Sequence, residues 1–277
     1  MKQIYPDFSV LVSVYYKENP KWLKESIDSV LSNTVLPKQI VIVKDGKLSN
    51  ELEEVLSVFE GNPLFQIVGY EENKGLGFAL NYGLRYCKYD YVARMDADDI
   101  CANNRFEEQL SLFVKDEALG LVGSSVSEFI DCPSNVVAIK KVPRLHSDIL
   151  KYCKKRNPFN HPTVMFVKDK ILQVGGYMDM YRYEDYFLWY RVLKNNVKTQ
   201  NVENCLVNMR VSNAFFQRRG GLKAFKQRMR LNRIMFQDRF VNFGTFLIVF
   251  FVNLFNLLIP NCVRKFLYFR FLRKKPI

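Results

Sequence analysis

Hydrophobic positions in the first hundred residues alternate between short continuous runs and stretches with helical spacing. The runs at residues 8–15, 39–43, 65–68 and 89–95 are rich in β-branched and aromatic side chains, which is usual for buried parallel strands. Helical stretches lie between them. The resulting β-α-β-α-β order predicts parallel strands joined by right-handed crossovers, and hence an α/β fold.

The helical stretches have apolar faces and clear ends. Asn19 can cap the first helix, with Pro20 at its first position. Further helices are expected at residues 50–60, 78–87, 105–115, 147–156 and around 183–189, and further strands at 119–129, 136–141 and 163–168. No internal repeat or low-complexity linker interrupts the pattern, so one α/β domain with an appendage is the simplest expectation.

Polar residues follow the predicted parallel strands. Tyr15 ends the first strand, Asp45 follows the second, residues 73–77 (NKGLG) follow the third and residues 96–99 (DADD) follow the fourth. Ligands of open α/β sheets bind at the carboxyl ends of the strands. We therefore expect these residues to line one crevice.

The DADD segment is the first candidate for chemistry. Asp96 and Asp98 stand at i and i+2 on an extended segment, so both carboxylates project to the same side. A hard divalent cation, Mn²⁺ or Mg²⁺, prefers such oxygen ligands and would stabilise a diphosphate leaving group. The alternative is a solvated acidic turn that caps the next helix.

Four segments, in this order and spacing, resemble glycosyltransferase family 2, whose members are inverting enzymes with the GT-A fold. They are SVYYKE at 13–18, VKDG at 43–46, NKGLGFALN at 73–81 and ARMDADD at 93–99. The likeness covers about residues 8–210, and it is greatest to the bacterial transferases that build O-antigen, capsule and exopolysaccharide. It implies a Rossmann-like, nucleotide-binding mixed sheet flanked by helices.

The resemblance, together with the change in charge and composition near residue 216, predicts a division of the chain. Residues 1–215 would form the GT-A domain, with about 1–100 binding the nucleotide sugar and about 101–215 binding the acceptor. Residues 216–277 would form a separate helical region that associates with a membrane.

Carried over residue by residue, the resemblance implies that Tyr15 packs on the nucleobase and that Asp45 accepts a hydrogen bond from the uracil imide. Arg94 and Asp96 would lie near the ribose and diphosphate, and Asp98 would ligate the metal. Tyr15 could instead be a core aromatic, and Asp45 a turn former. The full set expected at the nucleotide sugar is Ser13, Tyr15, Glu18, Asp45, Asn73, Gly75, Arg94 and Asp96.

The acidic pair Glu184-Asp185 opens the helix near residues 183–189. Inverting transfer needs a base for the acceptor hydroxyl, and the resemblance assigns this role to Asp185, with Glu184 as a helper or acceptor ligand. Without the resemblance, acids at a helix start simply complement its dipole. Trp189, one turn further on, could stack on an acceptor sugar or belong to the core.

His161, between Asn160 and Pro162, is a further candidate. It could touch the diphosphate or join Asp96 and Asp98 as a metal ligand, or it could be a structural histidine. The loop at 73–77 lacks the full GxGxxG spacing, so a nicotinamide enzyme is not expected.

The cysteines are scattered. The six of them form no CxxC pair and stand with only two histidines, so neither a zinc cluster nor a disulfide framework is expected. The N-terminus lacks the apolar stretch of a signal peptide, so the catalytic part is expected to stay in the cytoplasm.

The net charge of +13 lies entirely in the C-terminal region. Residues 217–277 hold 14 Lys and Arg against the single acid Asp238, and the uncharged segment 240–263 is strongly apolar. Basic flanks on both sides of an apolar segment predict a peripheral or monotopic anchor on anionic lipid, rather than a nucleic-acid site. A buried helical hairpin with a basic face is the alternative.

Together these features predict an inverting glycosyltransferase at the cytoplasmic face of the bacterial inner membrane. It would move a hexose, galactose or glucose, from a UDP-sugar to a polyprenyl-diphosphate-linked sugar acceptor. The alternatives are a nucleotidyltransferase that makes the nucleotide sugar, although no Gly-rich loop follows the first strand, and an inactive membrane-bound scaffold with the same fold.

Overall fold

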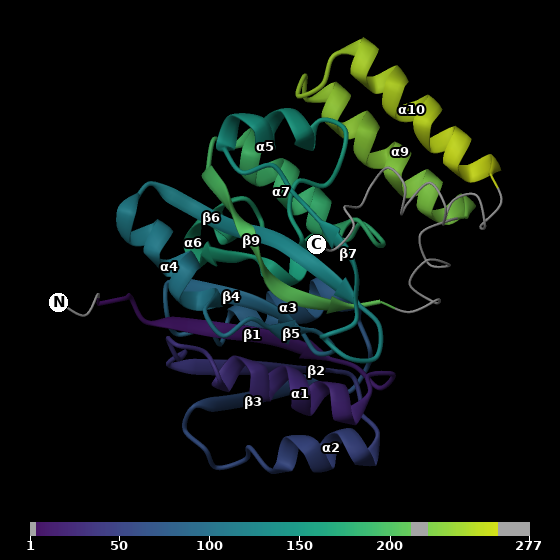
Figure 1. Ribbon diagram of the computed structural model, residues 1–277. Coiled ribbons are helices and arrows are strands. Elements are labelled where there is room, and N and C mark those ends of the chain that lie inside the picture. Colours follow the sequence, from purple (N-terminus) through teal and green to yellow (C-terminus); the bar gives the residue numbers. More distant parts are fainter. Residues whose placement is uncertain (1–3, 212–220, 260–277) are drawn as a thin grey trace.

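The computed structural model describes residues 4–211 and 221–259 (Figure 1). The strands are β1 Phe8–Val14, β2 Gln39–Asp45, β3 Phe65–Tyr70, β4 Tyr91–Asp96, β5 Ile100–Cys101, β6 Leu119–Phe129, β7 Val136–Lys140, β8 Met165–Val167 and β9 Lys198–Arg210. The helices are α1 Pro20–Leu31, α2 Asn50–Ser57, α3 Leu76–Leu84, α4 Arg105–Lys115, α5 His146–Cys153, the 3₁₀ turn η1 His161–Thr163, α6 Lys168–Gln173, α7 Glu184–Lys194, α9 Leu222–Gln237 and α10 Phe243–Leu258.

One mixed sheet organises the chain. Its strand order is β3-β2-β1-β4-β8-β6-β9-β5, with β7 paired to β6. The four strands β3, β2, β1 and β4 are parallel, as expected from the β-α-β order, and β8 is antiparallel to both neighbours. The expected α/β mixed sheet flanked by helices is therefore confirmed.

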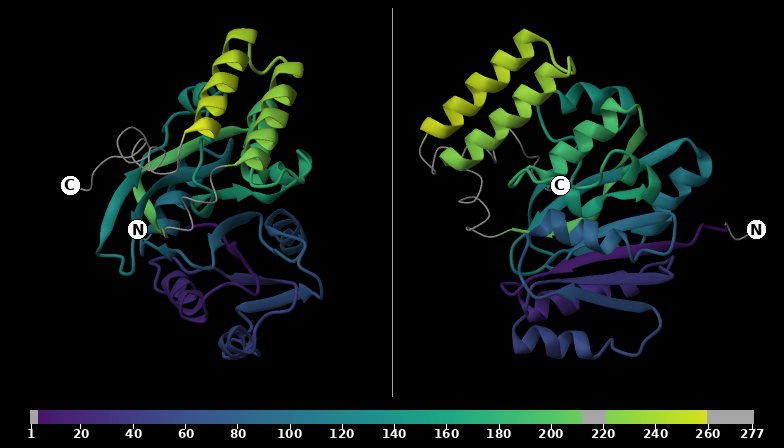
Figure 2. Two further views of the ribbon diagram at one scale, coloured as in Figure 1. Left: turned by 90° about the vertical axis from the view of Figure 1, so that its right-hand side faces the viewer. Right: turned by 180° about the vertical axis from the view of Figure 1, so that it is seen from behind.

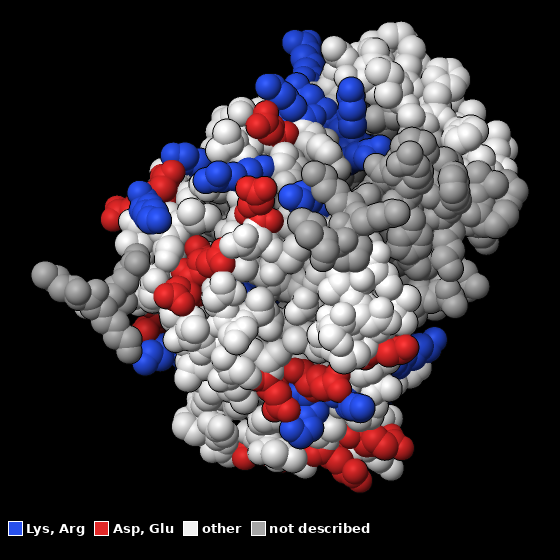
Figure 3. Space-filling model, viewed as in Figure 1, with Lys and Arg blue, Asp and Glu red and all other residues white. Residues whose placement is uncertain are grey.

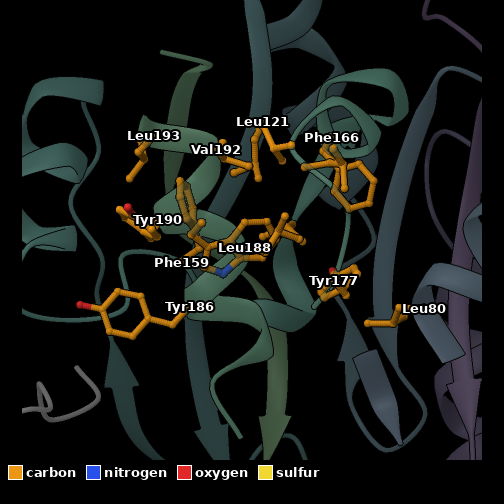
Figure 4. Packing of buried hydrophobic residues seen from close by; sticks show 14 of the residues in the cluster. Leu80, Leu121, Phe159, Phe166, Tyr177, Tyr186, Leu188, Tyr190, Val192 and Leu193 are labelled. Atoms are coloured by element: carbon orange, nitrogen blue, oxygen red, sulfur yellow. The ribbon is translucent and has the colours of Figure 1, made fainter. Parts of the chain in front are cut away.

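Two hydrophobic clusters cover the two faces of the sheet. One joins α1, α2 and α4 to the sheet through residues such as Leu23, Leu52 and Phe106. The other joins α3, α5, α7 and α9 to the sheet, and its centre is the group around Leu188 and Tyr190 in Figure 4. Helices on both faces leave the strand ends as the open edge of the sheet (Figures 1 and 2).

Strand β9 was not predicted. Its sequence, KTQNVENCLVNMR, is polar and does not alternate regularly. The buried polar residues of this strand find partners inside the protein: Asn201 Nδ2 donates to the carbonyl oxygen of Pro143 at 2.7 Å, and Thr199 Oγ1 lies 3.0 Å from His146 Nδ1. Tertiary hydrogen bonds thus compensate for residues that a hydrophobic pattern does not recognise.

Helix α9 is part of the core. Leu231 and Met235 belong to the same buried cluster as the α7 residues Leu188 and Tyr190. The boundary expected near residue 215 therefore does not mark a break in packing, because α9 covers a face that α7 would otherwise expose to water.

Helix α10 packs on α9 (Figure 1). Several of its large apolar side chains are exposed to solvent. Its exposed large hydrophobic residues are Phe243, Ile248, Phe251, Val252, Phe255 and Leu258. Within residues 4–211 and 221–259, no helix has the length and apolarity needed to cross a bilayer. The basic residues expected to flank the apolar segment on its C-terminal side, from Arg264 onward, lie outside the described residues, as do Arg218 and Arg219.

Candidate active site

The carboxyl ends of β1, β2, β3 and β4 meet at one edge of the sheet, as the sequence predicts. Ser13 of β1 is in register with Asp96 of β4, and Asp45 of β2 is in register with Tyr70 of β3. Tyr15 follows β1 at the same edge and is half-buried. Parallel pairing thus brings the predicted nucleotide-sugar residues together.

Glu18 lies in the turn that follows Tyr15. Its backbone N–H donates to the Tyr15 carbonyl oxygen at 3.0 Å, and its side chain is half-buried. The Tyr15 ring lies next to Tyr16, with 5.8 Å between the ring centroids. The turn therefore keeps Tyr15 and Glu18 close to the end of β1.

Asp45 is buried, and its carboxylate holds the loop at 73–77. It accepts hydrogen bonds from the Tyr70 hydroxyl at 2.8 Å, from Asn73 Nδ2 at 3.0 Å and from the backbone N–H groups of Lys74 and Gly75. These donors occupy the lone pairs of both oxygens. In this structure Asp45 positions the loop, and a uracil imide would have to displace one of these donors.

Gly46 makes the close approach of this loop possible. Its φ is 84°, and a Cβ at this position would lie 2.6 Å from the backbone nitrogen of Asn73. Any other residue would therefore strain the backbone at position 46 and push the turn after β2 away from the loop at 73–77.

The acidic segment after β4 forms a compact cluster. Carboxylate oxygens of Asp96, Asp98 and Asp99 lie within 4.8 Å of one another. Burial, followed by the charge of Asp96, raises the pKa of Asp98 to about 6. Burial, followed by the charges of Asp98 and Asp96, raises the pKa of Asp99 well above its usual value. Three carboxylates this close together resist ionising unless positive charge neutralises them. A divalent cation, which prefers oxygen ligands, would supply that charge.

Hydrogen bonds from other elements hold the acidic segment in place. Ser26 Oγ donates to the Asp96 carbonyl oxygen at 2.8 Å, Arg210 N donates to Asp99 Oδ1 at 2.9 Å, and Arg210 Nε donates to the Asp98 carbonyl oxygen at 3.1 Å. The cluster is thus held by α1 and by β9, the strand that was not predicted.

Arg94 lies between the two groups of acids. It is 1% exposed and pairs through Nη2 with Asp96, while its buried Nε and Nη1 have no hydrogen-bond partner. Burial raises the pKa of Glu184 and Asp185, and the charge of Arg94 opposes part of that rise. Buried guanidinium groups without partners are costly, so this site fits an anionic ligand.

Asp185 is fixed at the start of α7. Asn157 Nδ2 donates to its Oδ2 at 2.6 Å, and the backbone N–H of Tyr186 donates to its Oδ1 at 2.6 Å. Burial raises the pKa of Asp185, while these hydrogen bonds and the nearby Lys140 oppose the rise. Its orientation is therefore set before any ligand binds.

Two cavities lie on either side of the acidic pair. The first, about 450 Å³, is lined by Glu184, by Asn81 and by the segments 74–78 and 177–182. The second, about 440 Å³, contains Asp185. Its remaining lining residues are Lys140, Asn157, Phe159, Asn160, His161, Pro162, Arg182, Tyr183, Tyr186, Met209 and Ala224. Neighbouring carboxylates thus face different cavities.

Burial raises the pKa of Glu184 to about 7, with a further contribution from Asp185. Asp185 raises it because two nearby carboxylates resist ionising together. The two acids therefore face different cavities, while burial raises the pKa of both.

Trp189 lies in the core, where it cannot contact an acceptor sugar. It is 0% exposed and packs edge-on against Phe159, 5.5 Å between ring centroids. The prediction that it stacks on a sugar is wrong for this structure, because α7 turns this side chain into the core. Periodicity alone places residue 189 near Asp185 but does not reveal which helix face meets the sheet.

His161 is not part of the metal cluster among the described residues. Its Nε2 lies 2.9 Å from the Tyr177 hydroxyl, and burial together with Arg94 lowers the pKa of its imidazole well below the usual value. The expected metal-ligand role therefore does not fit the structure, whereas a place in the wall of the second cavity does.

Two asparagines at the site were missed by the sequence analysis. Asn81 Oδ1 accepts from the Tyr177 backbone N–H at 2.8 Å, and its Nδ2 donates to the Tyr177 carbonyl oxygen. Asn157 holds Asp185 in the same way from another loop. Asn157 belongs to no recognisable pattern. Asn81 closes the predicted NKGLGFALN segment, but its role could not be predicted because its partner, like that of Asn157, is far away in the sequence.

The fold and the acid groups together point to a nucleotide-sugar enzyme, and comparison with known proteins identifies the family. The family model described as "Glycosyl transferase family 2" matches residues 9–176. This chain therefore belongs to glycosyl transferase family 2 and is a glycosyltransferase. The nucleotidyltransferase alternative does not apply.

Two relatives match along nearly their whole length. The chain is 39% identical to a UDP-Gal:alpha-D-GlcNAc-diphosphoundecaprenol beta-1,3-galactosyltransferase of Escherichia coli, covering 97% of this chain and 98% of the relative. It is 34% identical to the amylovoran biosynthesis glycosyltransferase AmsE of Erwinia amylovora, covering 94% and 97%. The relatives thus include bacterial surface-polysaccharide transferases.

Solved structures support the fold. The S. aureus TarS fragment 1–349 in complex with UDP-GlcNAc matches with a TM-score of 0.65 at 13% identity, covering 90% of this chain and 71% of that chain. The mannosyltransferase PcManGT from Pyrobaculum calidifontis, in complex with GDP-Man and Mn²⁺, matches with a TM-score of 0.63 at 15% identity, covering 90% and 72%. At such identities the likeness supports the GT-A fold alone.

Proposed function

We propose that this enzyme transfers galactose, with inversion, from UDP-galactose to a sugar carried on a polyprenyl diphosphate. Glucose is the second donor sugar to test. The observation that carries the proposal is the pair Glu184-Asp185 between two cavities, one bounded by the Asp45-held loop and the other lined by Asp185. The UDP-galactose and lipid-diphosphate substrates named for the E. coli relative supply the substrate classes.

The chemistry follows from the placement of the acids. The acceptor hydroxyl lies against Asp185, whose carboxylate takes the proton as the hydroxyl oxygen bonds to the anomeric carbon. The bond between that carbon and the diphosphate oxygen breaks, and UDP leaves with the electron pair. Because attack and departure occur on opposite faces of the carbon, one displacement inverts the anomeric configuration.

The donor side has residues for each part of UDP. Tyr15 and Glu18 at the end of β1 face the nucleoside, and Ser13 and Asn73 complete the crevice. Arg94 offers its unpartnered Nε and Nη1 to the anionic diphosphate. The structure makes Asp45 the holder of the loop that contains Asn73 and Gly75.

Asp96, Asp98 and Asp99 would hold a divalent cation, Mn²⁺ or Mg²⁺. When bound, it would neutralise negative charge on the departing diphosphate. Asp99 joins the expected pair, in place of His161.

We also propose that the enzyme works on the cytoplasmic face of the bacterial inner membrane, held there by α10 and the bases of α9. In Figure 3 the surface over α10 is free of charge in that view, and basic side chains gather next to it above α5. The exposed bases of α9 and the turn after it are Lys223, Lys226, Arg230, Arg233 and Arg239. An apolar face beside exposed bases suits an anionic lipid surface.

The proposal is tested with the full chain, Mn²⁺, a panel of UDP-sugars and GlcNAc-diphosphate-lipid. We expect transfer from UDP-galactose, a β-linked product, and loss of at least a hundredfold in kcat for Asp185→Asn. An α-linked product, or undiminished turnover by this variant, would reject the mechanism. If the chain neither binds UDP by calorimetry nor transfers any sugar, the inactive-scaffold alternative is correct.

A further inference from the structure

The cavity that contains Asp185 has an unusual combination of walls. Its volume is about 440 Å³, enough for a sugar together with a neighbouring group. Asp185 and Asn157, which are hydrogen-bonded to each other, form part of its wall. The other residues include two basic side chains, Lys140 and Arg182, and Ala224 of helix α9.

The charges in this cavity favour an anion. Lys140 and Arg182 contribute two positive charges against the single carboxylate of Asp185. His161 adds none near neutral pH, because burial lowers the pKa of its imidazole well below the usual value. Burial raises the pKa of Asp185, and Lys140 lies close enough for its charge to oppose part of that rise. A neutral sugar alone would not need two cations.

Helix α9, which packs on α10 to form the C-terminal hairpin, contributes to the wall of the cavity. Ala224 is only 7% exposed, and one turn further along α9 the buried Arg228 lies over the ring of Tyr186, 4.9 Å from its centroid. Tyr186 itself lines the cavity. Arg228 Nη2 also donates to the Lys155 carbonyl oxygen at 3.1 Å. Helix α9 is therefore a fixed wall of the cavity, and its partner α10 exposes the apolar face.

These three features together suit a lipid-linked acceptor. A sugar whose hydroxyl lies at Asp185 carries its reducing-end group elsewhere in the same cavity, whose wall contains the two cations. Helix α9 forms part of that wall, and its partner α10 has the exposed apolar face that a lipid chain would contact. We propose that Lys140 and Arg182 bind the diphosphate of the acceptor, so that the cavity selects sugars that carry a diphosphate.

Lys140 is better suited than Arg182 for testing the acceptor cavity alone. Of the two cavities it lines the one that contains Asp185, whereas Arg182 lines both and can also face the donor. The inference rests on the proposed function, since it assigns residues to the acceptor of that same reaction. A test centred on Lys140 separates the acceptor diphosphate from the diphosphate of UDP-galactose.

The experiment uses the full chain and three acceptors that share one sugar: the lipid diphosphate, the lipid monophosphate and an uncharged alkyl glycoside. For Lys140→Gln we expect KM for the diphosphate acceptor to rise about tenfold or more, the usual cost of a charge-assisted hydrogen bond. KM for the uncharged glycoside and for UDP-galactose should stay within twofold. Lys140→Arg should recover most of the loss, since it keeps the charge.

Lys151→Gln is the matched control. Lys151 is an exposed lysine of α5 outside the cavity, paired with Asp148 at 3.8 Å, and its loss should leave all three KM values unchanged. Equal losses with all three acceptors would overturn the inference, as would a raised KM for UDP-galactose alone. If the unmodified chain transfers nothing to any acceptor, the proposed function itself is rejected. If the unmodified chain is active, the relative use of the three acceptors tests the inference alone.

Discussion

Asn157 donates its Nδ2–H to Asp185 Oδ2 over 2.6 Å, so a loop before η1 orients a carboxylate at the start of α7. The hydrogen bond favours the ionised form of Asp185, which is the form that can accept a proton. The base of the proposed reaction thus depends on a residue that no motif identifies.

Asn157→Ala should lower kcat about tenfold with little change in the KM of the donor. The lost hydrogen bond raises the pKa of Asp185, so a larger fraction of the enzyme holds a protonated base at a given pH. In the plot of kcat against pH, the acidic limb should therefore shift to higher pH by about one unit. Asn195→Ala, at the other end of α7, is the control, and an unmoved limb in Asn157→Ala would contradict this role.

Asp98→Asn should weaken binding of Mn²⁺ about tenfold or more, measured by calorimetry in the presence of UDP, because it removes one oxygen anion from the cluster of three. Asp28→Asn changes only an exposed ion pair with Lys24 and should have no effect. Unaltered Mn²⁺ affinity in Asp98→Asn would exclude this carboxylate as a ligand.

Glu184→Gln should change the pH dependence of stability. The folded protein raises the pKa of Glu184 from 4.5 to about 7. Between these values the folded form keeps a proton that the unfolded chain releases, so the wild type loses stability as pH rises through this window. The glutamine variant lacks that loss and should gain up to about 3 kcal/mol on the wild type between pH 5 and pH 8. Urea unfolding at the two pH values measures the difference; an equal difference at both would contradict the shift.

Trp189→Phe should reduce stability and leave acceptor recognition intact. The side chain is completely buried, so the smaller ring leaves a gap in the core and costs about 1–3 kcal/mol. KM for the acceptor should stay within twofold. A selective rise in this KM, with unchanged thermal stability, would restore the sugar-stacking role.

Two truncations should separate the roles of α9 and α10. A chain ending at residue 241 keeps Leu231 and Met235 in the core and should fold, but it should no longer sediment with anionic vesicles. A chain ending at residue 211 exposes the covered face of α7 and should melt at a much lower temperature. Equal vesicle binding by the full chain and the 241-residue chain would exclude α10 as the anchor.

The sequence by itself determined the half of the sheet that we propose to bind the nucleotide sugar. Hydrophobic runs define β1 to β4, and parallel strands with short crossovers must place their carboxyl ends at one edge. Local order in the chain therefore predicts that Ser13, Asp45 and Asp96 lie together, as their strand registers confirm. The DADD segment needs no distant partner to bring its own carboxylates together.

Only the tertiary structure decided the arrangement of the proposed acceptor half and the contacts of individual side chains. Trp189 turned out to be core and His161 a partner of Tyr177, because the face that a helix buries depends on what packs against it. Asn157 reaches Asp185 from another loop, and α9 closes a cavity begun by residues far earlier in the chain. Sequence spacing fixes contacts within an element and between neighbouring strands, whereas these contacts depend on packing between distant segments.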